Sequence, residues 1–316
     1  MANHAAESGT TRLVVEASDA GIRLDAFLVR RQQSQSTSAA RRMVASGVVR
    51  VSGKVAKKGY RVQAGDQVDL AADRSLIATL APAPNLPLDL VYEDEWIVAV
   101  NKPAGLPAHP LKADETHTLA GALVARFPGC AQASPDPREG GLAHRLDVGT
   151  SGVLVAARSR EAWHRLREAL SDPACEKIYL AELWGAFPAG LVNEFILPGR
   201  TPDSYVVTAP IGRQGRRGER VVLAGGRNPL PSRTEFRLVE RRAESCLVEA
   251  RLSKGRTHQV RVHAASLGTP VWGDEVYGHP ADGLRLHAHA VVFVHPFTTR
   301  ALRLEARGPA WTALAD

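Results

Sequence analysis

The sequence is poor in cysteine. It has three cysteines in 316 residues, Cys130, Cys175 and Cys246, and no CxxC pair. Disulfide-stapled secreted domains and zinc knuckles both need closely spaced cysteines, so the sequence favours neither class. Histidines occur at positions 258, 263, 287, 289 and 295. Because no HExxH motif or cysteine partner accompanies them, the sequence predicts a protein of a reducing compartment that holds no metal.

Long apolar runs are also missing. No segment approaches the roughly 18 apolar residues that a membrane-spanning helix requires. The first residues, MANHAAESGTTRL, contain no apolar core of a secretory signal peptide. The GTSG at 149–152 is not a GxSxG nucleophile elbow, which disfavours a serine hydrolase. We therefore expect a cytoplasmic protein without a membrane segment.

Positive charge is in excess. The formal net charge is +7, 44% of the residues are hydrophobic, and the pI is near 9.6. These values indicate one large or two modest domains with a polyanionic partner. The segment from Gly21 to Val62 contains ten basic residues and one acidic residue, Asp25. The basic residues are Arg23, Arg30, Arg31, Arg41, Arg42, Arg50, Lys54, Lys57, Lys58 and Arg61. We expect this segment to hold the backbone of a polyanion, with a solvated basic face as the alternative.

The most informative stretch is HRLDVGTSG at 144–152. It places one carboxylate, Asp147, between charged residues and a turn of small residues, directly before the apolar run Val153–Ala157. The pattern predicts that Asp147 lies on a turn leading into a buried strand, a common place for a functional site. A solvated turn with a capping Asp is the alternative, and it does not explain the surrounding residues.

Further stretches resemble the RluA class of pseudouridine synthases, in the same order along the chain. They are VYEDEWIVAVNKPAGLPAHP at 91–110, HRLDVGTSG at 144–152, EKIYLAELWG at 176–185, GRTHQVRVHAASLGTPVWGD at 255–274 and RLHAHAVVFVHP at 285–296. The similarity covers nearly all of residues 88–306. It implies an isomerase that converts uridine in RNA to pseudouridine, with Asp147 as the catalytic residue and no cofactor.

That reaction needs one carboxylate and a neighbouring cation. The base must be released from its glycosidic bond, rotated and rebonded through a ring carbon, and the carboxylate can attack either the pyrimidine ring or the sugar. Desolvation in a pocket favours the neutral acid, so a cation beside Asp147 is expected. The resemblance implies that Arg256 of the GRTHQ stretch fills this place. Contact with a phosphate is the alternative for Arg256.

The resemblance also assigns roles to other residues. Tyr179, on a strand-like segment, is expected in the pocket as a base or as a stacking face for uracil. Arg145 is expected to brace the RNA when the nucleotide is extruded, and His144 to orient the turn. Thr150, Ser151, Gly149 and Gly152 are expected to shape the loop, the glycines through unusual dihedrals, and Lys102 is expected to contact RNA. Val148 and Gly149 replace a charged pair that many members of the class carry, so RNA contacts made there in other members are not expected here.

We predict five segments. Residues 1–20 are expected to be a flexible N-terminus, 21–70 an RNA-binding module, 71–87 an Ala- and Pro-rich linker, 88–306 the catalytic domain and 307–316 a C-terminal tail. The module, with two helices before short strands and a turn at Val51-Ser52-Gly53, resembles the RNA-binding domain named after the fourth protein of the small ribosomal subunit. Its second helix starts with Ser38-Ala39 where that family has Ser-Arg.

The catalytic segment alternates strand-like and helix-like patterns. Helices are expected at LAGALVARF and REAWHRLREAL, and strands at 178–184, 203–209, 219–223, 234–239, 246–252 and 289–294. Many strands with few crossovers predict an α+β fold, with a mixed, largely antiparallel sheet in the catalytic domain and a small N-terminal α/β module.

RNA is the expected partner. Large-subunit ribosomal RNA is the first candidate and transfer RNA the second, and the protein is expected to be a monomer. Arg213, Arg216, Arg217 and Arg220 are expected to form a second RNA contact, with a role in solubility as the alternative. The rival hypothesis is a non-catalytic RNA-binding or ribosome-assembly protein. It does not require Asp147, Tyr179 and Arg256 together.

Overall fold

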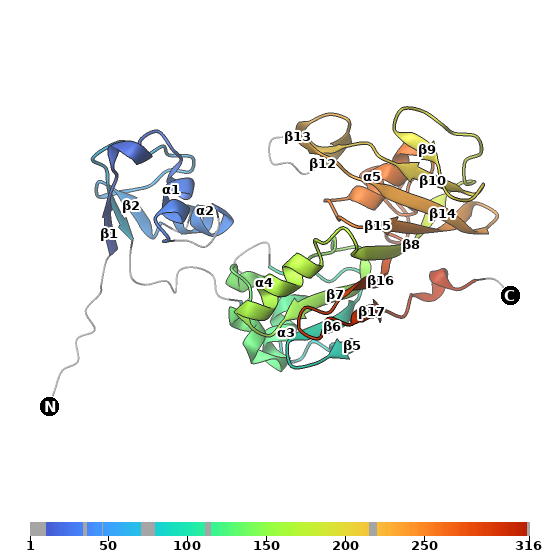
Figure 1. Cartoon of the computed structure of the whole chain (residues 1–316), viewed down its shortest axis with the longest axis horizontal. Coiled ribbons are helices and arrows are strands. Elements are labelled where there is room, and N and C mark those ends of the chain that lie inside the picture. The colour runs from blue at the N-terminus through green and yellow to red at the C-terminus, as the bar shows by residue number, and fades with distance from the viewer. Residues whose placement is uncertain are drawn as a thin grey trace. The chain divides into compact units, whose positions relative to one another are not determined.

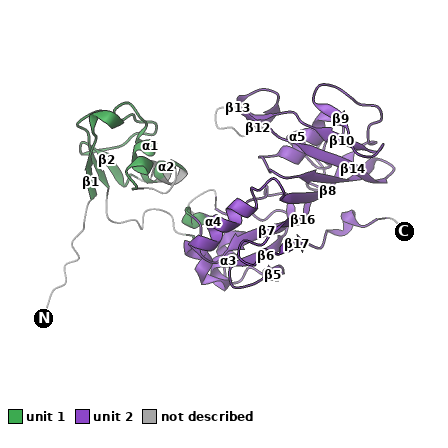
Figure 2. Cartoon of the chain, in the orientation of Figure 1, with its two compact units in different colours: residues 1–81, 135–138 green, residues 82–134, 139–316 purple. Residues whose placement is uncertain are grey.

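The computed structural model describes residues 11–33, 37–45, 47–70, 80–110, 115–214 and 220–314. The chain divides into two compact units, residues 1–81 with 135–138 and residues 82–134 with 139–316 (Figure 2). Each unit is described by itself. Within the described residues, no helix has the length and apolar character needed to cross a membrane.

The first unit packs two helices against a small sheet. Its elements are β1 (Thr11–Val14), η1 (Ala17–Asp19), α1 (Leu24–Arg30), α2 (Thr37–Ala45), β2 (Val49–Val51), β3 (Lys54–Val55) and β4 (Gln67–Leu70). The sheet order is β1-β4-β2-β3, and every pairing is antiparallel. Its core includes Phe27, Leu28, Val49 and Val68, all fully buried. The apolar side chains of both helices thus have a core of their own.

The expected flexible N-terminus is wrong from residue 11 onward. β1 pairs with β4 along its whole length, and Arg12 binds Asp69 at 2.6 Å. β1 has four residues, of which only one side chain is half-buried, so its sequence shows no apolar pattern typical of a strand. The strand is stabilised by its pairing with β4, which is distant in the sequence. Residues 71–79 of the expected linker lie outside the described residues. Residues 82–87 belong to the second unit, where Ala83 N donates to Gly121 O.

The second unit is built on a ten-stranded sheet (Figure 1). The strands are β5 (Leu90–Glu93), β6 (Ile97–Lys102), β7 (Ser151–Ala157), β8 (Glu176–Trp184), β9 (Ile196–Pro198), β10 (Ser204–Val207), β14 (Thr234–Arg241), β15 (Ser245–Leu252), β16 (Leu286–Val294) and β17 (Ala301–Glu305). Their order is β5-β6-β7-β16-β8-β15-β14-β10-β9, with β17 on β16. Only the β7–β16 pairing is parallel, so the predicted mixed, largely antiparallel sheet is confirmed.

Three helices and a second sheet complete this unit. The helices are α3 (Leu119–Arg126), α4 (Arg160–Ala169) and α5 (Gln259–Ser266), with 3-10 turns η3 (Pro128–Gln132) and η5 (Ala310–Thr312); η4 (Pro137–Glu139) is a further short turn. The small sheet has β11 (Ile211–Gln214) between β12 (Arg220–Leu223) and β13 (Arg227–Leu230). Thr118 and Ser159 cap α3 and α4, as helix-start residues commonly do. Leu119, Leu123 and Val124 of α3 and Leu166 of α4 are buried, whereas Trp163 of α4 is half-buried.

Two apolar clusters lie along the large sheet. In one, α4 packs Ala162 and Leu166 on β7, and in the other, Val260 and Ala264 of α5 share a core with residues of β8, β14 and β15. All seven residues of β7 are buried, and β7 lies inside the sheet between β6 and β16, which makes it a rigid support. The two clusters therefore fix the strands from which the candidate site is built.

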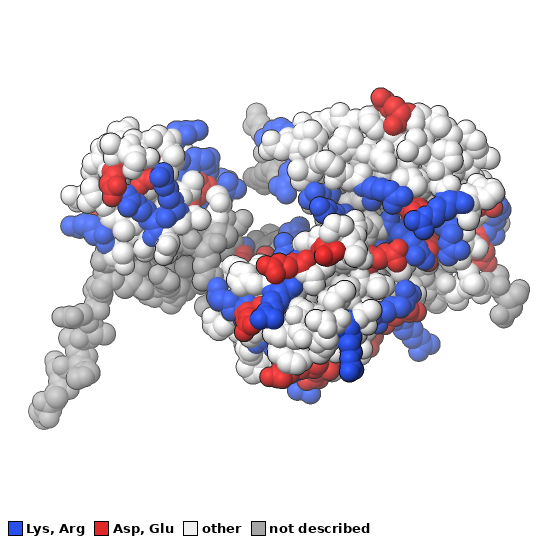
Figure 3. Space-filling model, in the orientation of Figure 1, with Lys and Arg blue, Asp and Glu red and all other residues white. Residues whose placement is uncertain are grey.

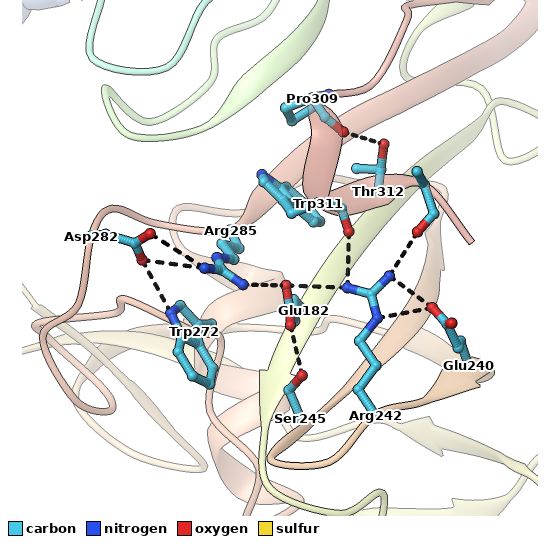
Figure 4. A network of polar contacts seen from close by, with 11 residues as sticks. Glu182, Glu240, Arg242, Ser245, Trp272, Asp282, Arg285, Pro309, Trp311 and Thr312 are labelled. Carbon is cyan, nitrogen blue, oxygen red and sulfur yellow. Dashed lines mark hydrogen bonds and ion pairs between the residues drawn. The ribbon is translucent and has the colours of Figure 1, made fainter. Parts of the chain in front are cut away.

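The C-terminal residues are attached to the second unit. The guanidinium of Arg242 donates to the carbonyl of Trp311 at 2.9 Å, as Figure 4 shows. It also donates to the carbonyl of Ala313 at 2.8 Å. The expectation of a separate tail at 307–316 is therefore wrong up to residue 313. Residues 307–316 show no periodic pattern in the sequence. Their attachment could not be predicted from it, because Arg242 binds backbone carbonyls, which every residue has.

Candidate active site

Asp147 lies on a tight turn that enters β7. Thr150 N donates to Asp147 O at 3.0 Å, closing the turn, as the sequence predicts. Gly152 has φ of 114°, and a Cβ there would lie 2.2 Å from Ala288 O. A side chain is therefore excluded where β7 meets β16. Gly149 does not adopt a positive φ, so the unusual dihedral expected there is absent; a Cβ there would lie 3.2 Å from Leu284 Cβ.

The cation beside Asp147 is Arg261, in the first turn of α5. Its Nη1 donates to Asp147 Oδ2 at 3.0 Å, while its Nε and Nη2 hold Asp274 at 2.7 and 2.8 Å. Asp274 is 1% exposed, and the side chain of Asp147 is 24% exposed. Burial lowers the pKa of Arg261, but its bonds to the two carboxylates outweigh this and raise it. Arg261 therefore remains a permanent cation at the turn.

The pairing expected for Arg256 is thus corrected. Arg256 borders two of the pockets that Asp147 also borders. Its Nε is buried without a hydrogen-bond partner among the described residues, and its backbone N donates to Gln259 Oε1 at 3.0 Å. Arg256 lies on the loop before α5, whereas Arg261 lies on the helix. Both arginines fall within GRTHQVRVH, and the sequence does not say where the helix begins.

His258 and Tyr277 complete the surroundings of Asp147. His258 adopts a left-handed φ of 54° at the start of α5 and places its Nε2 3.7 Å from Asp147 Oδ2. Its Nδ1 lies 3.0 Å from the Tyr277 hydroxyl, which accepts a hydrogen bond from Val221 N at 3.0 Å. Tyr277 was not foreseen, because its role depends on a loop that folds back beside α5.

Asp147 lies where three pockets meet. One, of about 490 Å³, is bordered by His258, Arg261 and the loop residues 273, 275, 276, 283 and 284. A second, of about 500 Å³, is bordered by His144, Arg167, Lys177, Tyr179, Lys254 and Arg256. A smaller one of about 50 Å³ contains Tyr179, Arg256, His258 and Arg261. Arg145 and Asp147 border all three. The two larger volumes are in the range of ligand sites, and the second is rich in cations.

Tyr179 belongs to this site, as expected. It lies on β8 opposite Ala250 and Ala288 and borders the second and the smaller pocket. Burial, and then the charge of Asp147, raise the pKa of Tyr179 well above its usual value. The phenol is therefore protonated at neutral pH, where it offers a hydrogen-bond donor and an aromatic face.

His144 and Arg145 differ in environment. His144 Nε2 accepts a hydrogen bond from Val155 N at 3.1 Å, which ties the turn to β7. Burial, with smaller contributions from Lys177 and Arg167, lowers the pKa of His144 to about 3, so the ring is neutral. Arg145 is exposed at the mouths of the pockets.

Lys102 is corrected from an RNA contact to a structural residue. It is fully buried, and its Nζ donates to Pro103 O (2.8 Å), Leu106 O (2.8 Å) and Val148 O (3.1 Å). Burial lowers its pKa to about 8, and the charge of Asp147 opposes that shift. Lys102 therefore joins the loop after β6 to the Asp147 turn, and RNA cannot reach it.

A buried carboxylate anchors the loop that borders the first pocket (Figure 4). Glu182 on β8 accepts hydrogen bonds from Ser245 Oγ (2.6 Å) and Arg285 Nη1 (2.7 Å). Arg285 also binds Asp282, which accepts a bond from Trp272 Nε1 at 3.3 Å. Residues 272–285 are therefore fixed to the sheet at both ends, and this pocket wall is preorganised.

The other residues expected to bind RNA are only partly described. Lys54, Lys57 and Lys58 are exposed, whereas Arg41 binds the buried Asp25 at 2.6 Å. The side chains of Arg42 and Arg220 and all of Arg216 and Arg217 lie outside the described residues, and Arg213 is exposed on β11. Within the described parts of the chain, no cluster of three or more His, Cys, Asp or Glu side chains could hold a metal ion.

The buried histidines make the second unit sensitive to acid. Burial lowers the pKa of His144 to about 3 and that of His263 to about 4. Below the ordinary histidine pKa of 6.5, these histidines bind protons in the unfolded chain but not in the folded protein. The free energy of unfolding therefore falls as the pH decreases from 6.5 towards the lowered pKa values. Each histidine should reduce the free energy of unfolding by about 1.4 kcal/mol at pH 5.5 relative to pH 7.5.

Urea unfolding followed by tryptophan fluorescence measures this effect, because all five tryptophans lie in the second unit. His263→Gln should show a smaller loss on acidification than the wild type. The matched control is His117→Gln, at an exposed position, which should retain the wild-type pH dependence. Equal pH dependence in all three proteins would contradict the assignment.

Comparison with known proteins gives the same picture for both units. Residues 96–266 match the family described as RNA pseudouridylate synthase, and residues 22–68 match the S4 domain. A Synechocystis protein named an uncharacterized RNA pseudouridine synthase is 33% identical over 298 residues, covering 92% of this chain and 86% of its own. The ribosomal large subunit pseudouridine synthase D of Xanthomonas campestris is 34% identical over 321 residues, covering 96% and 90%. Among solved structures, human RNA pseudouridylate synthase domain containing 1 is similar with a TM-score of 0.55 and 27% identity, covering 72% of this chain and 86% of that one.

Proposed function

Because the chain belongs to the RNA pseudouridylate synthase family and carries an S4 domain, we propose that Asp147 is the nucleophile that isomerises a uridine of large-subunit ribosomal RNA. The observation that carries this proposal is the Asp147 carboxylate, held by Arg261 at the meeting point of the pockets. The proposal places the protein in the cytoplasm and requires no metal or cofactor.

The geometry prepares Asp147 for attack. The bond from Arg261 goes to Oδ2, so Oδ1 is the oxygen that adds to the substrate, at the sugar carbon or the pyrimidine ring. The bond between N1 and the sugar carbon breaks, the uracil turns, and C5 bonds to the same sugar carbon. The bond between Oδ1 and the substrate breaks before the product leaves, which restores the Asp147 carboxylate. C5 then loses its proton and N1 gains one, so atoms and charge balance without another reactant. Arg261, fixed by Asp274, orients Asp147 throughout.

Tyr179 and Arg145 act on the substrate in this proposal. Because the Tyr179 phenol is protonated, it offers its ring to stack on the extruded uracil and its hydroxyl as a donor. Arg145 is exposed at the pocket mouths, where a guanidinium can brace the RNA from which the nucleotide has left. Arg256, whose side chain borders the second pocket, is suited to a phosphate of the same nucleotide.

Ribosomal RNA is proposed from the relatives. Proteins named ribosomal large subunit pseudouridine synthase D align with 92–96% of this chain at 32–35% identity. A non-catalytic RNA-binding protein needs none of the arrangement around Asp147. Transfer RNA remains the second candidate, because the same pockets accept any extruded uridine.

Mapping of pseudouridines tests the proposal. Total RNA from cells with and without the gene should differ at one or a few uridines of large-subunit ribosomal RNA, and the purified protein should restore them on an unmodified transcript. A difference confined to transfer RNA would show that the substrate is transfer RNA and not ribosomal RNA. Identical maps, together with an inactive purified protein, would overturn the proposed reaction.

The S4 domain should supply salt-dependent RNA binding. Replacing the exposed Lys54, Lys57 and Lys58 by Gln should weaken RNA binding and reduce the slope of log affinity against log salt by about 2, since each phosphate contact with a single strand contributes about 0.7. The kcat at saturating RNA should stay within twofold of the wild type. An unchanged slope would show that these lysines do not bind RNA.

A further inference from the structure

A second basic depression lies outside the three pockets around Asp147. It has a volume of about 610 Å³ and is bordered by residues of β10, β14 and β15 and by residues 173–176. We call it the arginine groove, after four of its residues, Arg200, Arg233, Arg237 and Arg251. Figure 3 shows Lys and Arg side chains gathered over β14 and β15. The catalytic steps above make no use of these residues.

The groove lies on the face of the sheet opposite to Tyr179. Ala250 pairs with Tyr179 and Arg251 with Ile178, so Arg251 points to the other face, because neighbouring residues of a strand alternate. Glu235 and Arg237 of β14 pair with Arg251 and Glu249, and therefore share the face of Arg251. The groove is thus reached from the site only around the end of the sheet.

The same two segments border both depressions at that end. In the first segment, residues 170, 171 and 177 border the second pocket and residues 173–176 border the groove. In the second segment, residues 254–257 border the second pocket and residues 252 and 253 border the groove. Lys177 Nζ joins the two segments by donating to Leu170 O at 3.0 Å and Ser253 O at 2.9 Å. A chain leaving the second pocket over this rim therefore enters the groove.

The charges of the groove are arranged with the guanidiniums outward. The side chains of Arg233, Arg237 and Arg251 are 57%, 52% and 42% exposed, whereas those of Glu235 and Glu249, which they bind, are 16% and 13% exposed. Glu176, 39% exposed, binds Arg251 at 3.1 Å. The less exposed carboxylates of Glu235 and Glu249 therefore position the guanidiniums, which face the solvent.

Most guanidinium donors remain available. Arg233 and Arg237 each use one Nη2 contact, at 3.2 and 3.4 Å, of the five N–H groups that an arginine carries. Arg200 is exposed and makes no hydrogen bond or ion pair with the described part of the chain. Guanidiniums bind phosphate oxygens in pairs, and a polyanion can add to these contacts without breaking them.

We propose that the arginine groove binds the phosphate backbone of the RNA strand that flanks the target nucleotide. The strand leaves the pocket of Tyr179 and Arg256, crosses the rim at Lys177 and lies along Arg233 and Arg237. This inference rests on the proposed function for the identity of the RNA. It adds a second binding surface, on the opposite face of the sheet, to the catalytic unit.

The test compares two triple variants of the full-length protein with equal charge. The groove variant replaces Arg200, Arg233 and Arg237 by Gln. The control replaces Arg126, Arg160 and Arg165, exposed residues of α3 and α4 that border neither the groove nor the three pockets. Filter binding to a single-stranded poly(U) RNA and to an unmodified large-subunit ribosomal RNA transcript is measured from 50 to 300 mM salt, with thermal unfolding to confirm the fold.

The groove variant should bind both RNAs at least tenfold more weakly near 150 mM salt, with the salt slope reduced by about 2, while the control stays within twofold of the wild type. On the transcript, KM should rise and kcat at saturation should not change. Equal binding by the groove variant and the wild type, or equal losses in both triple variants, would overturn the inference. Since affinity for poly(U) does not depend on catalysis, failure of the groove is distinguishable from failure of the proposed reaction.

Discussion

Replacing Asp147 by asparagine should lower kcat for pseudouridine formation by at least about 10⁴-fold, the scale of loss when an enzyme loses its nucleophile. Asparagine has nearly the same shape, and its amide oxygen can still accept the bond from Arg261 Nη1. A neutral amide, however, cannot form the covalent bond that starts the reaction. RNA affinity should remain within a few fold of the wild type, because phosphate contacts dominate it.

The measurement is single-turnover formation of pseudouridine at saturating RNA. Asp69→Asn is the matched control, because Asp69 is also bound by an arginine, Arg12, at 2.6 Å but lies in the S4 unit. The control should retain wild-type kcat. Near wild-type activity of the Asp147 variant would refute the assignment of the nucleophile. Loss of activity together with loss of RNA binding would instead indicate a damaged fold.

The position of Asp147 was predictable because the signal is local. A run of small residues followed by five apolar ones requires a turn and then a buried strand, and the structure has both, at 147–150 and in β7. Tyr179 followed from a strand pattern and the family resemblance, and β8 carries it beside the pockets. Short-range pattern was sufficient for the turn and strand around Asp147, whereas Tyr179 was selected only with the help of the resemblance.

The choice between Arg256 and Arg261 was not predictable from local pattern. Which guanidinium reaches Asp147 depends on α5 starting at Gln259 and on Asp274, thirteen residues after Arg261, folding back to bind it. The burial of Lys102 was also not predictable from local pattern, because a lysine beside polar and turn residues suggests a solvent-facing cation. Three carbonyls brought together by tertiary folding make burial possible.

Replacing Arg261 by methionine should have the second largest effect, on both stability and activity. Asp274 is 1% exposed and loses both bonds to the guanidinium, which leaves a buried carboxylate without its cation. Removing one partner of a buried ion pair costs about 3–5 kcal/mol of unfolding free energy. Asp147 loses its orienting contact at the same time, so kcat should fall at least about 100-fold. Urea unfolding followed by tryptophan fluorescence and single-turnover kinetics measure the two effects.

The double variant Arg261→Met with Asp274→Asn separates the two roles of Arg261. It removes the uncompensated charge, so it should recover much of the lost unfolding free energy, yet Asp147 still has no cation and kcat should remain low. Arg256→Met is the matched comparison within the same motif. Because Arg256 has no ionic partner among the residues that the structure describes, its replacement should leave stability within about 1 kcal/mol of the wild type and raise KM more than it lowers kcat. If the Arg256 variant lost kcat while the Arg261 variant kept it, the cation that orients Asp147 would be Arg256, and Arg261 would serve only to hold Asp274.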